Sequence, residues 1–391
     1  MNVILFDDSL IRANLLPLTF TRPVADIRIG ILTIREKWEK LTGLITSSKT
    51  ETYLSAKFPT EFTIDIDNVW INGSLLPDKI VLEEIKALQP KHALLKGDIL
   101  IGVNSGNEKE FPSQLDNYKK VTSKAELQQI KFPWDIFSKN DVALRADFDM
   151  LTTGRKSLPI SESNRVIGKE KIFIEEGAKV ECSILNADTG PIYIGKDAEV
   201  MEGSIIRGPF SLGEHSTLKL GTKIYGATTI GPHSKVGGEV SNSVVFGYSN
   251  KAHDGFLGNA VISEWCNLGA DTNNSNLKNN YGEVKLWNYA KKEYIPTGLT
   301  FCGLIMGDHS KSGINTMFNT GTVVGVNANI FGAGFPATHI PSFSWGGTED
   351  STVYKLPNAF DVAARVFERR GLVFDEIEQK IMTHIFEITR S

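Results

Sequence analysis

One short stretch of the chain holds several polar side chains that are able to do acid–base chemistry. Between Lys251 and Asn276 it reads KAHDGFLGNAVISEWCNLGADTNNSN, with His253 near its start. Imidazole has an ordinary pKa near neutral pH, so His253 could act as a general base toward an attacking amine. A lone histidine is more often structural, and Asn276 could equally cap a turn, as could its neighbours Asn273 and Asn274. The meaning of the stretch therefore depends on the elements that position it.

A six-residue repeat is the element that would carry this stretch. Small residues follow many of the repeated positions, as in Ile194-Gly195, where a strand must turn and a side chain would collide. Each coil of such a solenoid buries its apolar row only against its neighbours. The repeat predicts a parallel β-helix over residues 160–345. The uninterrupted aliphatic series consists of Ile194, Val200, Ile206, Leu212, Leu218, Ile224, Ile230 and Val236.

Two segments interrupt the repeat, residues 238–252 and 273–300, and we interpret both as insertions. The same phase returns after each segment, first at Phe256 and later at Met306. A regular solenoid gains nothing from irregular loops, whereas loops that project at one level are where function gathers. The insertions therefore argue against a purely architectural spacer.

Alternating apolar and polar residues between 282 and 298 predict a hairpin in the second insertion. Lys291 and Lys292 lie near its turn, where a lysine pair is usually a solvated tip. Beyond the repeat, residues 346–391 are expected to form a C-terminal helical cap.

Composition sets limits on the class of protein. A chain of 391 residues predicts more than one domain, and a formal charge of −4 without a basic cluster indicates neither nucleic acid nor an anionic membrane as partner. Three widely spaced cysteines, Cys182, Cys266 and Cys302, are typical of a reducing compartment. The N-terminus lacks the long apolar core of a signal peptide, and no apolar run approaches the roughly 20 residues of a membrane span. We therefore expect a cytoplasmic protein.

The stretch from His253 to Asn276 resembles the acetyltransferase half of bifunctional enzymes that acetylate glucosamine 1-phosphate and then uridylylate it. The run GDHSKSGINTMFNTGTVVG from Gly307 continues the resemblance, which covers most of residues 160–345. It implies a left-handed β-helix and acetyl transfer from acetyl-CoA. The residues that fall on the family motif in order are His253, Gly258, Ile262, Asn267, Gly269, Ala270, Thr272 and Asn276.

The resemblance implies a role for each polar residue of the motif. His253 is the base that frees the sugar amine, the backbone N–H of Ala270 stabilises the oxyanion, and Asn276 holds the acceptor amine and sugar. The substrate-binding residues that it implies are Lys219, Lys251, Phe256 and Asn267.

Three positions depart from the family pattern. Lys219 stands where the family has an arginine, so it can neutralise a phosphate but lacks bidentate geometry. Phe256 replaces a tyrosine, and the lysine expected near Gly237-Gly238 is absent. These departures leave the identity of the acceptor open.

Residues 1–155 resemble the α/β, Rossmann-like domain of sugar-1-phosphate nucleotidyltransferases. A strand is followed by LLPLTFTRP, in which backbone and basic groups would hold a triphosphate, and PWDIF from Pro133 also matches. The pattern departs at FDD from Phe6, in the missing loop glycines, and at Val24, which occupies the place of the catalytic lysine. The nucleotide-binding residues that the resemblance implies are Arg12, Thr19, Arg22 and Arg28.

Two interpretations of this domain stay open. It is either a divergent uridylyltransferase or a degenerate domain that binds or scaffolds. Mg²⁺ for nucleotidyl transfer would need a carboxylate at a strand end, for which Asp98 is the best-placed candidate, ahead of Asp7 and Asp8. Asp98 could equally be a plain turn residue next to Gly97.

The order of motifs along the whole chain resembles a Bacteroidetes-type branch of these two-domain enzymes. The resemblance implies a homotrimer in which acyl-CoA lies between adjacent β-helices. Trp345, in PSFSWGG, could contact CoA or cap the core.

The function that these patterns predict is synthesis of UDP-N-acetylglucosamine from glucosamine 1-phosphate, with acetyl-CoA and UTP, or another nucleoside triphosphate, as cosubstrates. One alternative is a nucleotidyltransferase for another sugar 1-phosphate, such as a thymidylyltransferase, with an architectural repeat domain. Another is a non-catalytic trimeric scaffold that binds a sugar nucleotide.

Overall fold

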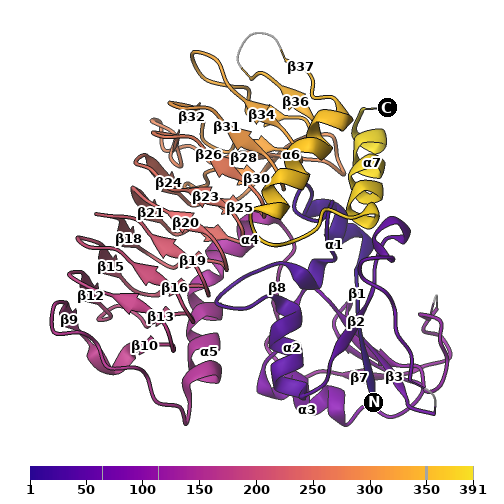
Figure 1. Cartoon of the computed structure of the whole chain (residues 1–391). Coiled ribbons are helices and arrows are strands. Elements are labelled where there is room, and N and C mark those ends of the chain that lie inside the picture. The colour runs from indigo at the N-terminus through magenta and orange to yellow at the C-terminus, as the bar shows by residue number, and fades with distance from the viewer. Residues whose placement is uncertain (64, 113, 348–350, 391) are drawn as a thin grey trace. The chain divides into compact units, whose positions relative to one another are not determined.

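The computed structural model describes residues 1–63, 65–112, 114–347 and 351–390, which form two compact units labelled by element in Figure 1. Unit 1 consists of Met1–Leu15, Thr21–Ile27 and Leu32–Phe132. Unit 2 consists of Leu16–Phe20, Arg28–Ile31 and Pro133–Ser391. Positions 348–350 and 391 of the expected C-terminal cap lie outside the described residues.

Unit 1 is built on a six-stranded mixed sheet, whose strands are β1 (Asn2–Phe6), β2 (Thr46–Lys49), β3 (Asn68–Asn72), β5 (His92–Lys96), β6 (Ile99–Asn104) and β7 (Lys119–Thr122). Their order is β2-β1-β3-β6-β5-β7, with β1 parallel to both of its neighbours. The apolar run of β1 is buried, as expected of a strand with a partner on each side. A separate antiparallel pair joins β4 (Leu75–Leu76) and β8 (Gln128–Gln129).

The helical segments of unit 1 are short: α1 (Ser9–Asn14), η1 (Val24–Asp26), α2 (Ile34–Thr42), η2 (Thr52–Leu54) and α3 (Lys79–Lys86). Thr33 and Glu36 form a reciprocal capping box at the start of α2, and Gly43 ends the helix with φ of 71°. Trp38 on α2 is fully buried and donates from Nε1 to the carbonyl oxygen of Leu75 at 3.1 Å.

Unit 2 is a parallel β-helix with three faces. The first face consists of β10 (Ile172–Ile174), β13 (Ile192–Ile194), β16 (Phe210–Leu212), β19 (Thr228–Ile230), β22 (Val244–Val245), β25 (Val261–Ile262), β30 (Ile305–Met306), β33 (Val323–Val324) and β35 (His339–Ile340). The second face consists of β11 (Lys179–Val180), β14 (Glu199–Val200), β17 (Thr217–Leu218), β20 (Lys235–Val236), β23 (Asn250–Lys251), β26 (Asn267–Leu268), β31 (Lys311–Ser312), β34 (Asn329–Ile330), β36 (Ser344–Trp345) and the antiparallel β37 (Thr352–Val353).

The third face consists of β9 (Arg165–Ile167), β12 (Ile184–Asn186), β15 (Ile205–Arg207), β18 (Lys223–Tyr225), β21 (Glu239–Ser241) and β24 (Phe256–Gly258), followed by the pair β27 (Asn273–Asn274) and β32 (Met317–Phe318). The one-turn segment η3 (Lys169–Lys171) precedes β10. The stacked coils are followed from β10 toward β36 in Figure 1.

The six-residue spacing becomes the three faces directly. Ile194, Leu212 and Ile230 pair on the first face at 18-residue intervals, so each repeat position moves the chain to the next face. Their side chains are fully buried in one continuous core along the solenoid axis. At the corner after the first face, residues such as His215 and His233 adopt positive φ of 54° and 57°. The predicted β-helix of hexapeptide repeats is confirmed.

Only one of the two predicted insertions exists. Residues 238–252 are not an insertion, because β21, β22 and β23 continue all three faces. The register pairs Thr229 with Val244 and Val244 with Val261, so two coils are shorter than 18 residues and the sequence phase slips. A shortened corner and an inserted loop both break a periodic pattern, and only pairing distinguishes them.

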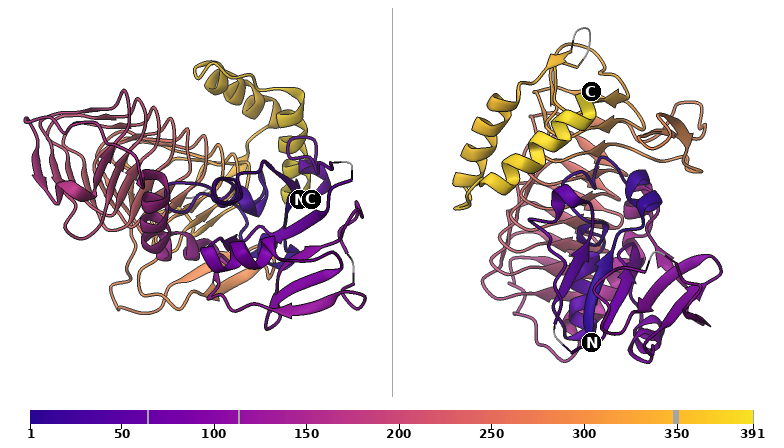
Figure 2. Two further views of the ribbon diagram at one scale, coloured as in Figure 1. Left: turned by 90° about the horizontal axis from the view of Figure 1, so that it is seen from below. Right: turned by 90° about the vertical axis from the view of Figure 1, so that its right-hand side faces the viewer.

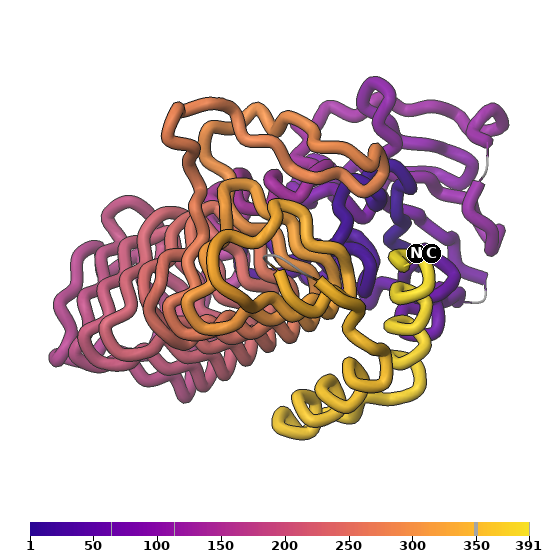
Figure 3. Tube along the Cα trace, turned by 90° about the horizontal axis from the view of Figure 1, so that it is seen from above, coloured from indigo at the N-terminus to yellow at the C-terminus, as the bar shows by residue number. Residues whose placement is uncertain are grey.

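The second insertion is confirmed. Val261 pairs with Ile305, so one coil carries a long excursion, which leaves the stack of coils as an orange segment in Figure 3. Within it β28 (Lys285–Asn288) and β29 (Glu293–Pro296) form the predicted antiparallel hairpin. Trp287 on β28 stacks on His339 with ring centroids 4.3 Å apart, which anchors the hairpin to the coils.

The helices α4 (Pro133–Ser138) and α5 (Asn140–Thr152) belong to unit 2, although residues 1–155 were expected to form one domain. Asn140 donates to Thr229 Oγ1 on the β-helix at 3.1 Å. Asn140 Oδ1 also accepts from the backbone N–H of Gly30 at 2.7 Å, so the segment Arg28–Ile31 joins the same unit. Long-range hydrogen bonds, rather than sequence order, therefore set this boundary.

The C-terminal helices are α6 (Leu356–Glu368) and α7 (Glu376–Arg390), drawn in yellow in Figure 2. Rings at one corner of successive coils stack on one another, with Tyr248 and Trp265 4.3 Å apart. Phe367 of α6 stacks on Trp265 at 4.2 Å, and Phe386 of α7 contacts Phe343 at the same corner of a later coil. The helices thus pack along the side of the coils, where an end cap was expected. Within the described residues, no helix has the length and apolarity that crossing a membrane requires.

Candidate active site

An open hollow of ≈ 620 Å³ lies at the corner between the second and third faces of the β-helix. Turns of successive coils bring its lining together, since residues far apart in sequence occupy the same corner. The hollow contains three of the predicted site residues, His253, Ala270 and Lys219. The remaining lining residues are Leu220, Gly237, Gly238, Ala252, Asp254 and Asp271.

His253 lies on the turn from β23 to β24, with its side chain exposed. Among the described residues its ring has no hydrogen-bond partner, so both ring nitrogens can reach a ligand. A catalytic base needs such an accessible nitrogen near the proton that it removes.

Two glycines allow the His253 turn to pack closely against the coil before it. A Cβ atom on Gly237 would lie 2.6 Å from the carbonyl oxygen of Ala252, and one on Gly238 would lie 2.7 Å from the carbonyl oxygen of Gly255. Gly238 also has φ of 78°. The lysine that the family places near Gly237-Gly238 therefore cannot be accommodated at either of these two positions.

Lys251 occupies a core position and does not face the hollow. It pairs in register with Val236 on the second face and is 3% exposed, so a lysine stands where neighbouring coils bury aliphatic residues. Its Nζ donates to the carbonyl oxygens of His253 at 2.8 Å, Asp254 at 3.1 Å and Gly237 at 3.3 Å. Burial lowers the pKa of Lys251 to about 8, while Asp254 and Asp271 oppose the shift. The ammonium group holds the turn that carries His253.

Ala270 also lines the same hollow. Its carbonyl oxygen accepts from the N–H of Asn315 at 2.9 Å, and its own N–H has no partner among the described residues. A fixed and unengaged N–H is the kind of donor that stabilises a developing oxyanion. Lys219 supplies a cation to this hollow, whereas Asp254 and Asp271 supply carboxylates.

Asn276 and Phe256 meet away from these residues, at Gly258 on the third face. A Cβ atom on Gly258 would lie 2.4 Å from the ring of Phe256 and 2.7 Å from Nδ2 of Asn276. Asn276 Nδ2 donates to Oδ1 of Asn259 at 2.8 Å. Asn259 was not among the predicted site residues, although it lies within the motif stretch from Lys251 to Asn276.

Asn267 lies on the outer side of the second face, in register with Lys311. It lines a different hollow, one that does not contain His253. Trp345 lies three strands further along the same outer column, is 44% exposed and stacks on Tyr354 at 5.1 Å. Its exposure does not fit a core-capping role.

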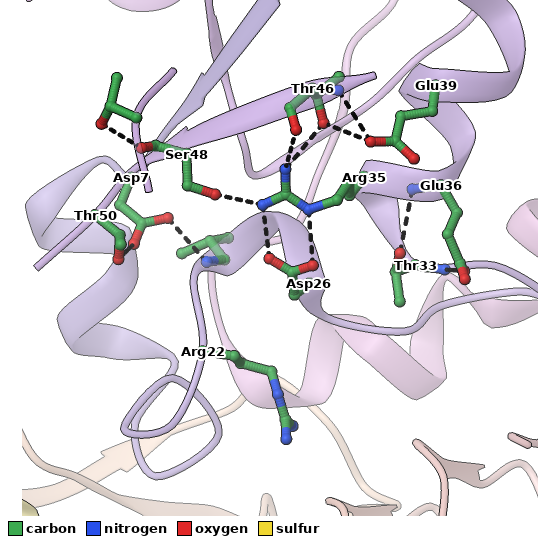
Figure 4. A network of polar contacts seen from close by, with 12 residues as sticks. Asp7, Arg22, Asp26, Thr33, Arg35, Glu36, Glu39, Thr46, Ser48 and Thr50 are labelled. Atoms are coloured by element: carbon green, nitrogen blue, oxygen red, sulfur yellow. Dashed lines mark hydrogen bonds and ion pairs between the residues drawn. The ribbon is translucent and has the colours of Figure 1, made fainter. Parts of the chain in front are cut away.

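The predicted nucleotide-binding residues are distributed over both units. In unit 1 the buried side chains of Arg12 and Asp7 form an ion pair of 3.0 Å, and Arg12 also donates to the carbonyl oxygen of Arg22. Burial raises the pKa of Asp7, while Arg12, Thr50 and the N–H of Val24 act against the shift. Figure 4 shows the hydrogen bond from Thr50 to Asp7, with the side chain of Arg22 pointing away from both residues. Val24 is fully buried, and its N–H donates to Asp7 at 2.8 Å.

A neighbouring arginine that the sequence analysis had not singled out completes this polar layer. Arg35 binds Asp26 with two hydrogen bonds of 2.8 Å and also contacts Thr46 and Ser48 (Figure 4). These contacts bind the start of the sheet to η1 and α2.

Thr19 and Arg28 belong to unit 2. Thr19 is fully buried, and Arg28 donates to the carbonyl oxygens of Phe246 and Ile31. The structure thus divides the four predicted residues between two units and engages Arg12 and Arg28 in internal contacts.

Asp98 does not lie in a metal-binding arrangement. It follows Gly97, which has φ of 56°, in the exposed turn between the antiparallel strands β5 and β6. Asp7 is already engaged by Arg12, Thr50 and Val24. Across the described ranges, no three His, Cys, Asp or Glu side chains gather to hold a metal ion. These residues do not fit Mg²⁺, and Asp98 has the position of a plain turn residue.

Comparisons with known proteins agree in part with this arrangement. Residues 3–156 match the family model described as sugar nucleotidyl transferase. A bifunctional sugar-1-phosphate nucleotidylyltransferase/acetyltransferase of Sulfurisphaera tokodaii is 30% identical over 201 residues, 51% of this chain and 43% of that protein. The bifunctional protein GlmU of Methanocaldococcus jannaschii is 34% identical over 89 residues, 23% of this chain and 21% of that protein. The chain thus spans less than half the length of the curated relatives it matches.

A solved UDP-N-acetylglucosamine acyltransferase of Arabidopsis aligns with 59% of this chain and 93% of its own, at 12% identity and a TM-score of 0.23. The matched family and both curated relatives are transferases.

Proposed function

We propose that unit 2 transfers an acetyl group from acetyl-CoA to the amine of an amino-sugar 1-phosphate, with glucosamine 1-phosphate as the acceptor. One observation carries the proposal: His253 and Ala270 line the same hollow, and neither the ring of His253 nor the N–H of Ala270 is engaged by another described residue. A base and an oxyanion donor beside one cavity are what attack of an amine on a thioester requires.

His253 accepts the proton that the amine loses as its nitrogen attacks the thioester carbonyl. The N–H of Ala270 stabilises the negative charge that develops on the carbonyl oxygen. The C–N bond forms, the C–S bond breaks, and the proton passes from His253 to the departing thiolate. Removal of a positioned base of this kind usually costs roughly 10²–10⁴ in rate.

Lys219 is the cation available to the sugar phosphate in this hollow, whereas the pair of Asn276 and Asn259 lies outside its lining. A point-charge lysine tolerates several phosphate orientations, whereas an arginine demands two parallel hydrogen bonds. We also propose that the chain forms a homotrimer. Sedimentation velocity on the purified chain tests this oligomeric state.

For the N-terminal segment we propose binding of a nucleoside triphosphate, UTP first, and uridylyl transfer to the sugar 1-phosphate. A specific observation favours a second candidate, nucleotide binding without transfer. Arg12 is paired with Asp7, Val24 is buried, and among the described residues no three His, Cys, Asp or Glu side chains gather to hold a metal ion. Phosphoryl-group chemistry depends on free cations around the transferred charge.

Two assays on the full chain separate these outcomes. Thiol release from acetyl-CoA with glucosamine 1-phosphate tests acetyl transfer, and pyrophosphate release from UTP with N-acetylglucosamine 1-phosphate tests uridylyl transfer. Thiol release alone fits a non-transferring N-terminal segment. Pyrophosphate release without thiol release contradicts the acetyl-transfer proposal and favours an architectural repeat. The same holds if pyrophosphate is released only when thymidine triphosphate replaces UTP. The absence of thiol release and of pyrophosphate release contradicts both proposed activities and favours a binding scaffold.

A further inference from the structure

A second hollow, of ≈ 470 Å³, lies between the second face of the β-helix and the C-terminal end of α6. It touches the His253 hollow at Ala252, which lines both. We call it the α6 groove, and all of its lining belongs to unit 2. The lining consists of Lys235, Tyr248, Asn250, Ala252, Trp265, Cys266, Asn267, Lys311, Val366, Arg369 and Arg370.

The charge of the α6 groove has a single sign. Lys235, Lys311, Arg369 and Arg370 line it, and no carboxylate does. None of these four cations takes part in an ion pair within the part of the chain that the structure describes. Like charges that converge without counterions repel one another, and a bound anion removes that cost.

The positions of the four cations follow from two independent elements. Lys235, Asn250, Asn267 and Lys311 form one outward column, paired in register on four adjacent strands. Neighbouring strands are about 4.8 Å apart, so the two lysines stand roughly 14 Å from each other along the column. This span suits a ligand with more than one phosphate group.

Packing of α6 fixes the opposite wall. Phe367 stacks on Trp265, and Ala363 and Phe367 are buried against the coils. Arg369 and Arg370 follow directly after this anchor, so they are held over the column. Burial, followed by the charge of Arg369, lowers the pKa of Arg370.

An unsatisfied polar atom marks the groove as incomplete. Oδ1 of Asn250 is buried and has no hydrogen-bond partner among the described residues. A buried acceptor without a partner destabilises the folded chain, and a ligand N–H or O–H that bonds to it would remove that cost. The lining therefore offers four cations for phosphate and one acceptor for a polar donor beside them.

We infer that the α6 groove binds the phosphate groups of a nucleotide that carries a diphosphate. Two sources share this chemistry, the nucleotide end of CoA and a nucleoside-diphosphate sugar. All lining residues of the groove come from one chain, unlike the site between adjacent β-helices that the family resemblance implies. The inference deepens the proposed function by naming the residues that hold a nucleotide next to the His253 hollow, and binding measurements test it independently of catalysis.

Isothermal titration of the full chain with CoA, and separately with UDP-N-acetylglucosamine, tests the inference. The variant Arg369→Gln/Arg370→Gln is expected to raise the Kd of one of these ligands about 30-fold or more, because hydrogen bonds to charged groups are among the strong ones. The matched control is Arg365→Gln, an exposed arginine on the same helix outside the groove. If the double variant does not fold, Lys235→Gln, at an exposed strand position, is expected to weaken binding of the same ligand.

Loss of CoA affinity alone assigns the groove to the acyl donor, and loss of UDP-N-acetylglucosamine affinity alone assigns it to a sugar nucleotide. Unchanged affinity for both ligands in the double variant and in Lys235→Gln overturns the inference. The variant His253→Ala separates this result from the proposed function. It is expected to abolish thiol release and to leave CoA affinity within about twofold, because its side chain lies outside the groove.

Discussion

The ammonium group of Lys251 lies 2.8 Å from the carbonyl oxygen of His253, and its side chain occupies a core position of the β-helix. Two further carbonyl oxygens, of Asp254 and Gly237, share the same ammonium group. A buried charge is costly unless hydrogen bonds satisfy it, and three carbonyl acceptors do so here. The residue that orients the candidate base is thus buried behind the hollow.

Replacing Lys251 by Met should lower acetyl transfer while His253 is still present. Methionine fills a similar volume but removes the donor shared by three carbonyl oxygens, and those of His253 and Gly237 lose the hydrogen bond that they accept from it. The turn from Ala252 to Gly255 thereby loses its anchor. We expect kcat to fall by about tenfold or more, since small misplacements of a catalytic group are costly. Steady-state kinetics measures the effect.

Lys223→Met, at an exposed lysine on β18, is the matched control. A purely structural role for Lys251 would lower the yield of folded protein without changing kcat per folded molecule. A normal kcat in folded Lys251→Met contradicts the positioning role.

Lys251 should also leave a signature in stability at alkaline pH. Its pKa in the folded chain is about 8, below the ordinary value of 10.5. Between these two values the unfolded chain binds a proton that the folded chain does not, so stability rises as the pH increases from 8 to 10.5. The rise amounts to about 3 kcal/mol at most. Urea unfolding across this range should show it in the natural protein and not in Lys251→Met, and parallel curves would refute it.

His253→Gln should lower kcat/KM for thiol release by about 100-fold or more, because the amide cannot accept the proton. The exposed position of His253 predicts an unchanged melting temperature. His215→Gln, on another corner of the solenoid, is the control and should retain full activity. Equal turnover in the two variants would exclude His253 as the base.

His339 should make unit 2 sensitive to acid. Its ring stacks on Trp287, Nε2 is buried without a partner among the described residues, and burial lowers the pKa to about 4. Because the unfolded chain protonates at the ordinary value of 6.5, stability falls as the pH drops from 6.5 toward 4. After allowance for solvent screening, the loss is roughly 1–2 kcal/mol.

His339→Phe keeps a ring against Trp287 and removes the titrating group. Chemical unfolding at pH 7 and pH 4.5 should show a smaller acid loss in this variant. An equal loss in both proteins would place the acid sensitivity elsewhere.

Asp7→Asn should destabilise unit 1 by up to about 3 kcal/mol, because it removes the buried counterion of Arg12 and leaves the exposed Glu51, 3.7 Å away, as a carboxylate partner. The double variant Asp7→Asn/Arg12→Met should recover part of that loss. Fluorescence of Trp38 and Trp70, both buried in unit 1, reports the unfolding transition. Additive losses in the double variant would show that the two side chains are not coupled.

The spacing of apolar residues alone determined the β-helix, because each sixth residue must point inward on the next face. The same spacing brings His253 and Ala270 to one corner, since they follow strands of the same face one coil apart. Their roles were predicted from the family resemblance. Hairpin alternation between residues 282 and 298 likewise depends on local pattern alone. Wherever structure follows from neighbours in sequence, the prediction was sufficient.

Other features of the site depended on contacts between residues that are far apart in the sequence, which a local sequence pattern does not predict. Lys251 looks like a polar substrate ligand in the sequence, and only register against Val236 places it in the core. The shortened coils after Val236 look like an insertion until strand pairing is known. Arg369 reaches the second face because α6 packs on Trp265, about a hundred residues earlier in the chain. Arg12 meets Asp7 because the strand end and α1 fold together, which turns an expected phosphate ligand into half of a buried ion pair. Sequence periodicity determines which residues are buried, whereas tertiary packing decides which charges remain available to a ligand.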